Sequence, residues 1–229
     1  MNFYNRSFRM RILAVSLFSL GHLWADSFSA TDSLSGGVTI DDPPIPGLAR
    51  TLTISTPFTQ ITDLSISLDI GSADGDTAWN GDLYAQLTSP SGTLSVLLNQ
   101  PGVTAVNPAG YGDSGFVITV LDSASSDIHG YQDVSYSLNG SSQLTGTWQS
   151  DGRTDPTSST RDKQLRRLLG ENPNGVWTLF ISDLANGNRA TLNSWSVNGV
   201  GTAVPEPQFA VFALGTALAG FVLWRRLVR

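Results

Sequence analysis

Residues 61–70 read ITDLSISLDI, and from Leu64 to Ile70 every second side chain is apolar. A period of two puts these apolar side chains on one face of an extended strand and the polar ones on the other. The same alternation recurs in four further segments, which are 83–87, 94–98, 116–120 and 177–181. We therefore expect a fold built from strands that each bury one face.

Turn signals separate these segments. SPSG (89–92) carries Pro at the second position of a β-turn, and NPNG (172–175) combines Asn, Pro and Gly. Many short strands divided by such turns predict an all-β fold, and specifically a jelly-roll antiparallel β-sandwich.

Three segments depart from this alternation. Residues 26–49 lack periodicity and contain DDPPIPG, so we expect a loose lead-in there, with the first strand near residues 49–55. Inside the domain the one helical candidate is RDKQLRRLL (161–169), which Gly170 would end. The polar segment 149–162 is expected to form a long loop.

Both ends of the chain have the composition of targeting segments. Residues 1–25 run from a basic start through the apolar ILAVSLFSL to Ala25, as a secretory signal peptide does. Residues 209–224 form a second apolar run, and Arg225 and Arg226 follow at once. We expect one C-terminal transmembrane helix in this second run.

Composition narrows the possible partners. The chain has no cysteine, so an exported domain must depend on its core rather than on disulfides. Residues 26–204 carry 18 Asp or Glu against seven Lys or Arg, a net charge of −11. Such a surface repels nucleic acid and anionic lipid. We therefore expect no nucleic-acid partner.

The segment GYGDSGF (110–116) contains GDSG, which surrounds the nucleophile of trypsin-like serine proteases. A serine nucleophile needs a histidine base and a carboxylate that orients it. Beyond the predicted signal peptide His129 is the only histidine, and it follows Ser114, whereas in chymotrypsin-like enzymes the histidine comes first. We interpret Ser114 as part of a turn before a strand and predict that the chain is not an enzyme.

Three segments together resemble a known family. They are WNGDLYAQLTSPSGT (79–93), GENPNGVWTLFISD (170–183) and LNSWSV (192–197). This combination resembles the P domain, or P/Homo B domain, that follows the catalytic domain in kexin- and furin-like subtilisin proteases. The resemblance covers residues 50–200. It implies a jelly-roll β-sandwich without the catalytic half of those proteins.

Some P domains bind calcium through loop carboxylates, and the resemblance gives as matching positions Asp74, Asp76, Asp82 and Asp183. The segment DGDTAWNGD (74–82) offers several oxygen ligands, and calcium takes roughly six to eight. Calcium is the only cofactor that the sequence suggests. The alternative is an acidic loop that is simply solvated.

The C-terminal segment 204–229 resembles the PEP-CTERM sorting signal of exopolysaccharide-producing Gram-negative bacteria. The residues that match are Val204, Pro205, Glu206 and Pro207, with Arg225 and Arg226 after the apolar run. The resemblance implies that an exosortase-type enzyme of the inner membrane processes the tail and passes the protein to the cell surface. Membrane anchoring would then be transient, and a permanent single-pass anchor is the alternative.

These observations predict an exported, non-catalytic β-sandwich module at the cell surface or in the extracellular matrix, acting by binding or scaffolding. Its expected partners are the exosortase-type enzyme, the inner membrane, and an exopolysaccharide or a surface protein. One alternative is an accessory domain for a separate subtilisin-like serine endopeptidase. The other is a carbohydrate-binding module, which needs exposed aromatic side chains on one face. We expect Trp79, Trp177 and Trp195 instead to pack in the core or at its edge.

Overall fold

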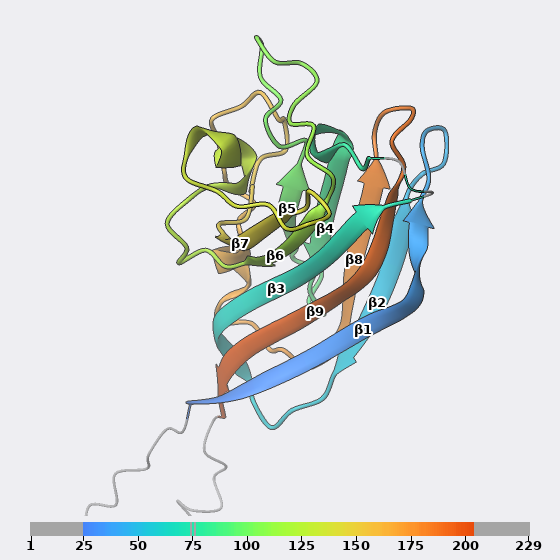
Figure 1. The fold of residues 1–229 in the computed structure, drawn as a ribbon. Coiled ribbons are helices and arrows are strands. Elements are labelled where there is room, and N and C mark those ends of the chain that lie inside the picture. Colours follow the sequence, from blue (N-terminus) through green and yellow to red (C-terminus); the bar gives the residue numbers. More distant parts are fainter. Residues whose placement is uncertain (1–24, 74, 76, 204–229) are drawn as a thin grey trace, which may run out of the picture.

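The computed structural model describes residues 25–73, 75 and 77–203, which form two β-sheets packed face to face (Figure 1). The first sheet contains β1 (Ala25–Ile40), β9 (Ala190–Thr202), β3 (Gln60–Ser72), β6 (Phe116–Val120) and β7 (Leu144–Trp148), in that spatial order. The second sheet contains β2 (Leu48–Ile54), β8 (Gly175–Asp183), β4 (Leu83–Thr88) and β5 (Leu94–Asn99), in that spatial order. The predicted all-β sandwich is confirmed.

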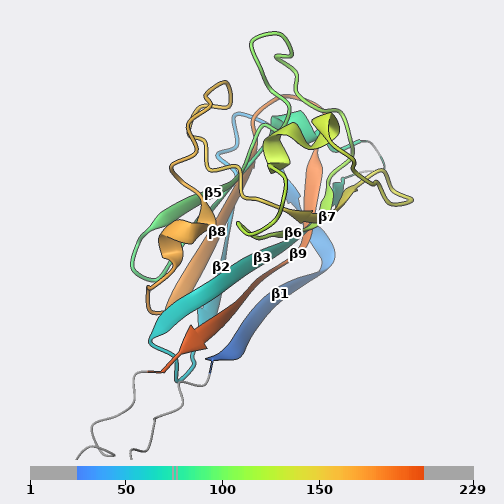
Figure 2. The ribbon, with the colours of Figure 1, turned by 90° about the vertical axis from the view of Figure 1, so that its left-hand side faces the viewer.

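The core lies between the two layers, which Figure 2 shows from the side. The alternating apolar side chains of β3 and β4 point into it: Leu64, Ile66, Leu68 and Ile70, and Leu83, Ala85 and Leu87, are all buried. Trp177 of β8 and Trp195 of β9 are 0% and 1% exposed. Complete burial of one aliphatic side chain contributes about 1.5–3 kcal/mol. Packing between the sheets is therefore the main stabilising contribution in a chain without disulfides.

The prediction of a loose lead-in at residues 26–49 is wrong. β1 occupies most of this segment and pairs antiparallel with β9 along nearly its whole length. β1 is an edge strand, and within residues 26–40 only Phe28 and Ile40 are fully buried. Its sequence shows no clear period because so few of its side chains reach the core. The strand expected near residues 49–55 is present as β2, the second strand.

Two other expectations also fail in detail. The helix predicted at residues 161–169 is only a short 3₁₀ turn, η3 (Leu165–Leu168), although Gly170 closes it with a positive φ of 85°. The sheet is not purely antiparallel, because β7 pairs parallel to β6. β7 follows β6 in sequence, but a long excursion that includes η2 (Ile128–Asp133) separates the two strands. A parallel pair requires such a crossover.

The predicted loop at residues 149–162 is irregular, and its backbone pairs with the free edge of β5. The N–H of Val96 donates to the carbonyl of Lys163 at 2.8 Å, and the N–H of Asp151 donates to the carbonyl of Leu97 at 3.1 Å. As a result Val96, Leu97 and Leu98 are all buried, and the alternation expected for this strand is absent.

Both ends of the sandwich domain leave it at the same place, because Ala25 pairs with Thr202 (Figure 1). The predicted signal peptide, except for Ala25, and the whole predicted sorting segment lie outside the described residues. Among the residues that are described, no helix is long and apolar enough to cross a membrane.

Candidate functional site

Three carboxylates from three separate elements face one another at one end of the sandwich. Asp183 is the last residue of β8, and Asp82 closes the 3₁₀ turn η1 (Asn80–Asp82) directly before β4. β4 and β8 are neighbours, and the N–H of Leu184 donates to the carbonyl of Asp82 at 2.9 Å. Asp42 follows β1, and its Oδ2 accepts from the N–H of Gly187 at 2.7 Å. We call Asp42, Asp82 and Asp183 the acid cluster.

The charged form of Asp183 is strongly disfavoured. The residue is 1% exposed, and its Oδ2 has no hydrogen-bond partner among the described residues. Burial raises the pKa of Asp183 to about 7; the Ala185 N–H opposes this rise, and the charges of Asp82 and Asp42 add to it. Burial also raises the pKa of Asp82, and the charge of Asp42 contributes. Ionised together, these groups repel one another at a site with little water.

Asp42 contributes a second unsatisfied oxygen. Its Oδ1 is buried and has no hydrogen-bond partner within residues 25–73, 75 and 77–203. A buried acceptor without a donor is unfavourable, and a buried carboxylate is more so. The acid cluster therefore contains two buried carboxylate oxygens without a hydrogen-bond partner among the described residues.

The sequence-based calcium residues fall into two groups. Asp82 and Asp183 lie at adjoining strand ends, whereas Asp74 and Asp76 lie outside the described residues. Asp42 was missed because it sits in the segment taken for a lead-in, where its contact with Gly187 has no sequence signal. In the part of the chain that the structure describes, no group of three or more His, Asp or Glu side chains has the geometry of a metal centre. Calcium binding therefore stays a prediction.

Ser114 does not have the surroundings of a nucleophile. It is 6% exposed, it forms an isolated β-bridge with Trp79, and its Oγ accepts a hydrogen bond from the N–H of Ala78 at 3.1 Å. The GDSG segment thus forms part of the turn that leads into β6, and its hydroxyl helps to hold the segment before η1 in place.

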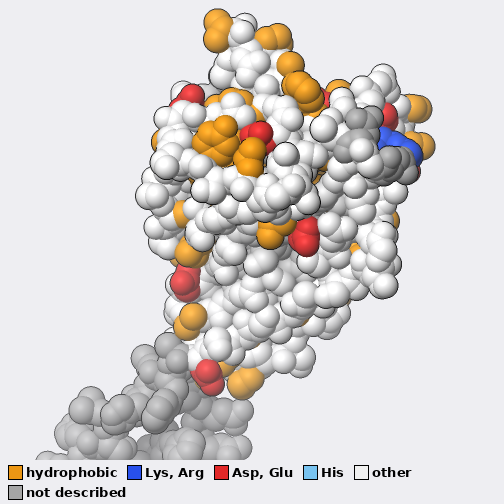
Figure 3. Space-filling view, in the orientation of Figure 1, with side chains coloured by type: hydrophobic (Ala, Val, Ile, Leu, Met, Phe, Trp, Pro, Cys, Tyr) orange, Lys and Arg blue, Asp and Glu red, His pale blue; other side chains and the backbone are white. Residues whose placement is uncertain are grey.

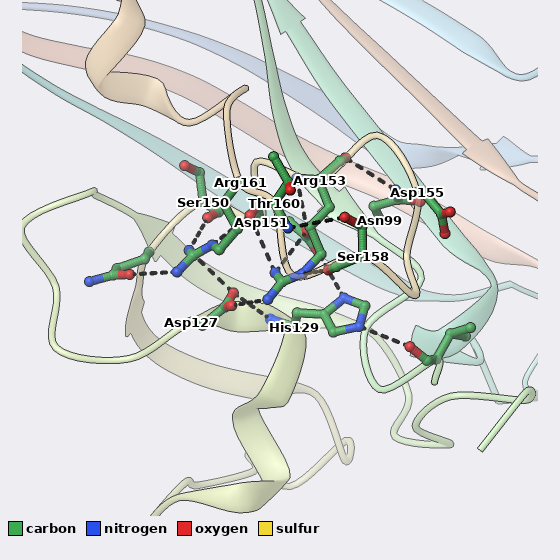
Figure 4. Close-up of polar contacts among 12 residues, drawn as sticks. Asn99, Asp127, His129, Ser150, Asp151, Arg153, Asp155, Ser158, Thr160 and Arg161 are labelled. Carbon is green, nitrogen blue, oxygen red and sulfur yellow. Dashed lines mark hydrogen bonds and ion pairs between the residues drawn. The ribbon is translucent and has the colours of Figure 1, made fainter. Parts of the chain in front are cut away.

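His129 forms a pair with a buried carboxylate, and both nitrogens of its ring have hydrogen-bond partners within the protein (Figure 4). Its Nδ1 lies 2.8 Å from Asp151 Oδ2, as in the His–Asp part of a catalytic triad. Its Nε2 lies 3.0 Å from the carbonyl oxygen of Val103 instead of a serine hydroxyl. Both neighbours accept only, so the ring satisfies both when it is the doubly protonated imidazolium. Burial opposes this charge, yet Asp151 outweighs it and the pKa of His129 is raised.

Two arginines complete a charged network around this pair (Figure 4). Arg153 donates to Asp127 at 2.7 Å and to the fully buried Asp151 at 3.2 Å. Arg161 lies 3.3 Å from Asp127 and donates to the carbonyl of Ser150. These contacts fix the loop at residues 149–162 against η2. The network has a structural role that the sequence did not indicate, because its members are far apart along the chain.

The sequence matches one known protein family. The family model for the proprotein convertase P-domain matches residues 71–198. No curated protein matches the chain significantly. Among solved structures, the serine protease of Aeromonas sobria in complex with its chaperone ORF2 is similar with a TM-score of 0.43 and 18% identity. That match covers 79% of this chain and 27% of the protease.

The structure of the Aeromonas sobria serine protease alone gives a TM-score of 0.42 and 17% identity, over 77% of this chain and 27% of the other. This chain therefore spans only about a quarter of the length of the proteases that it resembles. The family match covers more than half of the sequence and includes the acid cluster residues Asp82 and Asp183. The chain belongs to the proprotein convertase P-domain family.

Proposed function

We propose that the protein is an exported, non-catalytic module that acts by binding or scaffolding at the cell surface or in the extracellular matrix. The observation that carries this proposal is that both ring nitrogens of His129 are hydrogen-bonded, one to Asp151 and the other to the Val103 carbonyl. His129 is the only histidine among the described residues, and the Val103 carbonyl occupies the nitrogen that a general base would need. The family is that of an accessory domain of subtilisin-like proteases, and the matched region contains that domain alone.

The strand order supports the finer fold assignment. The order β1-β9-β3-β6 in one sheet, facing β2-β8-β4-β5 in the other, corresponds to a jelly roll with β7 added at one edge. This architecture places several connecting loops at each end of the sandwich. Loops presented on a rigid scaffold commonly carry binding residues.

We also propose that calcium binds at the end of the sandwich that carries the acid cluster. The acid cluster supplies three carboxylates and two unsatisfied buried oxygens, on Asp42 and Asp183. Asp74 and Asp76 are further expected calcium ligands, because the sequence resemblance includes them. Calcium is favoured over zinc, because the ligands are oxygens and the described residues contain no cysteine and only His129 as histidine.

Sorting through the C-terminal segment rests on the sequence. The fold is compatible with it, because β9 ends at Thr202, directly before the VPEP motif at residues 204–207. An exosortase-type enzyme acting at this motif would therefore leave the sandwich intact. The inner membrane would hold the protein only until that step.

The two alternatives differ in their support. The family match favours an accessory role beside a separate subtilisin-like endopeptidase. A carbohydrate-binding role cannot use Trp177 or Trp195, which are buried, and would need other aromatic side chains. The proposal is tested by fractionating the native host and by assaying the purified mature protein with casein. We expect it in the surface or extracellular fraction without peptidase activity, and a purely cytoplasmic protein or one that hydrolyses casein would contradict the proposal.

A further inference from the structure

Two adjoining hollows lie on the outer face of the second sheet. One hollow of about 630 Å³ lies between the proline-rich turn at residues 43–46 and the loop that carries Thr154. A second hollow of about 600 Å³ extends toward Lys163 and Arg167. Tyr84 and Thr154 line both hollows, which therefore adjoin, and we call the two together the Tyr84 groove. The volume of each hollow lies within the range of ligand sites.

The floor of the Tyr84 groove is made by side chains of the two central strands. Tyr84 on β4 pairs with Ser182, and Gln86 pairs with Phe180 on β8. Tyr84 Oη donates to Gln86 Oε1 at 2.7 Å, which holds the phenol in place. The backbone groups of β4 are already paired with β5 and β8, so a peptide cannot add here as an extra strand. Recognition must use aromatic rings, amides and hydroxyls.

One wall of the groove is fixed before any ligand arrives. Asn99 donates to the carbonyl of Arg153 at 3.1 Å, and the Arg153 guanidinium is held by Asp127 and Asp151. Thr154 follows directly, so the charged network around His129 anchors this wall. A preformed site loses less conformational entropy when it binds a ligand.

The two ends of the groove differ in charge. Lys163 and Arg167 line one end, where Lys163 lies 3.7 Å from Asp162, whereas the buried Asp183 lines the other. Arg167 donates to the carbonyl of Leu94 at 3.1 Å, and no carboxylate within the described ranges lies at ion-pair distance from it. The charge of Arg167 also acts on Glu171, whose carboxylate accepts from Ser89 and Ser91. The Arg167 guanidinium nevertheless lines the hollow, where it favours an anionic group on the ligand.

The opposite face of the sandwich offers no comparable feature. Neutral side chains dominate the outer face of the first sheet, with few hydrophobic or charged groups over β1, β9 and β3 (Figure 3). The hollow that does lie over β3 and β6 is lined by Ser67, Asp69, Val117 and Thr119, among others, and includes no aromatic side chain. Phe28 and Phe58 line a further hollow of about 520 Å³ beside β1, but no Lys or Arg side chain lines it.

We propose that the Tyr84 groove binds one chain of an anionic polysaccharide. A sugar ring would stack on Tyr84 and Phe180, its hydroxyls would meet the groove amides, and a uronate carboxylate would meet Arg167. Lys163 and Arg167 place the anionic sugar at their end of the groove. This inference rests on the proposed binding role and names the ligand class for it.

The test is affinity electrophoresis of the full chain in mild detergent, in gels that contain alginate as polyuronate, dextran as neutral glucan, or poly-glutamate as anionic peptide. We expect strong retardation by alginate and little by dextran or poly-glutamate. Tyr84→Ala should weaken alginate binding by about tenfold or more, since a central aromatic anchor is lost, whereas Tyr84→Phe should keep most of it. Thermal melting of each variant verifies that it is folded.

The charge requirement has a matched control on the same 3₁₀ turn. Arg167→Ala should weaken alginate binding, whereas Arg166→Ala, with the same change of charge outside the groove, should not. Equal effects of these two variants, retardation by dextran or poly-glutamate as strong as by alginate, or full binding by folded Tyr84→Ala would each overturn the assignment. None of these results bears on export or on the absence of peptidase activity, so the proposed function can stand or fall separately.

Discussion

Replacement of the buried Asp183 carboxylate by an amide should stabilise the calcium-free protein at alkaline pH. The pKa of Asp183 is about 7 against an ordinary 3.8, because burial and the charges of Asp82 and Asp42 disfavour its ionised form. At about 1.4 kcal/mol per pKa unit, this difference amounts to roughly 4 kcal/mol. An amide at this site must still find its own hydrogen-bond partners, so we expect Asp183→Asn to raise the free energy of unfolding by about 2–3 kcal/mol near pH 8.

The sign of this effect follows from linkage. The pKa of Asp183 is higher in the folded protein than in the unfolded chain, so the destabilisation is complete above about pH 7 and disappears below about pH 4. The advantage of Asp183→Asn should therefore shrink steadily as the pH falls. Thermal unfolding in EDTA at a series of pH values measures it, with an expected shift of several degrees in Tm at about pH 8.

Two controls make this result specific. Asp162→Asn removes a carboxylate whose side chain is 61% exposed and should leave Tm unchanged. Calcium at about a hundred times its Kd should stabilise the wild type by about 2.7 kcal/mol and Asp183→Asn much less. The reasoning fails if Asp183→Asn is less stable than the wild type in EDTA near pH 8, or if its advantage is the same at both ends of the pH range.

Two further predictions concern the charged network and the tail. His129→Gln should destabilise the protein by about 1–3 kcal/mol, most strongly below about pH 6.5, because the raised pKa of His129 gives stability that is lost as the pH rises through the folded value. Urea unfolding at acidic and alkaline pH measures this, and a deficit that grows with pH would contradict it. Mass spectrometry of the mature protein from its native host should find a C-terminus near residues 204–207 and no peptide from Phe209 onward. Recovery of an intact C-terminus at Arg229 from the membrane fraction would indicate a permanent anchor instead.

The strands that could be predicted are those with one face in the core. β3, β4 and β8 alternate apolar and polar side chains because each has the second layer on one side only, so a period of two marks them in the sequence. β1 was not predicted, because it is an edge strand that buries only Phe28 and Ile40 among residues 26–40. The sequence predicted β5, but it did not predict that consecutive side chains of this strand are buried. The loop that pairs with the strand comes from residues 149–162, which are distant in sequence.

The candidate site was only partly predictable, for a related reason. Asp82 and Asp183 belong to segments that resemble the family, and the structure places them on adjoining strand ends. Asp42 joins them through a contact with Gly187 that links residues 145 positions apart. His129 and Asp151 are 22 positions apart, and they join η2 to a loop that has no regular structure. Local patterns carry no information about such tertiary contacts.

The central claim, that this P domain is a non-catalytic binding module, is tested most directly by labelling the full chain with a fluorophosphonate probe. A reactive serine needs a free base, and both ring nitrogens of His129 are occupied by Asp151 and Val103. We therefore predict no labelling of Ser114 in the wild type or in His129→Ala. Stoichiometric labelling of Ser114 that His129→Ala abolishes would contradict the account.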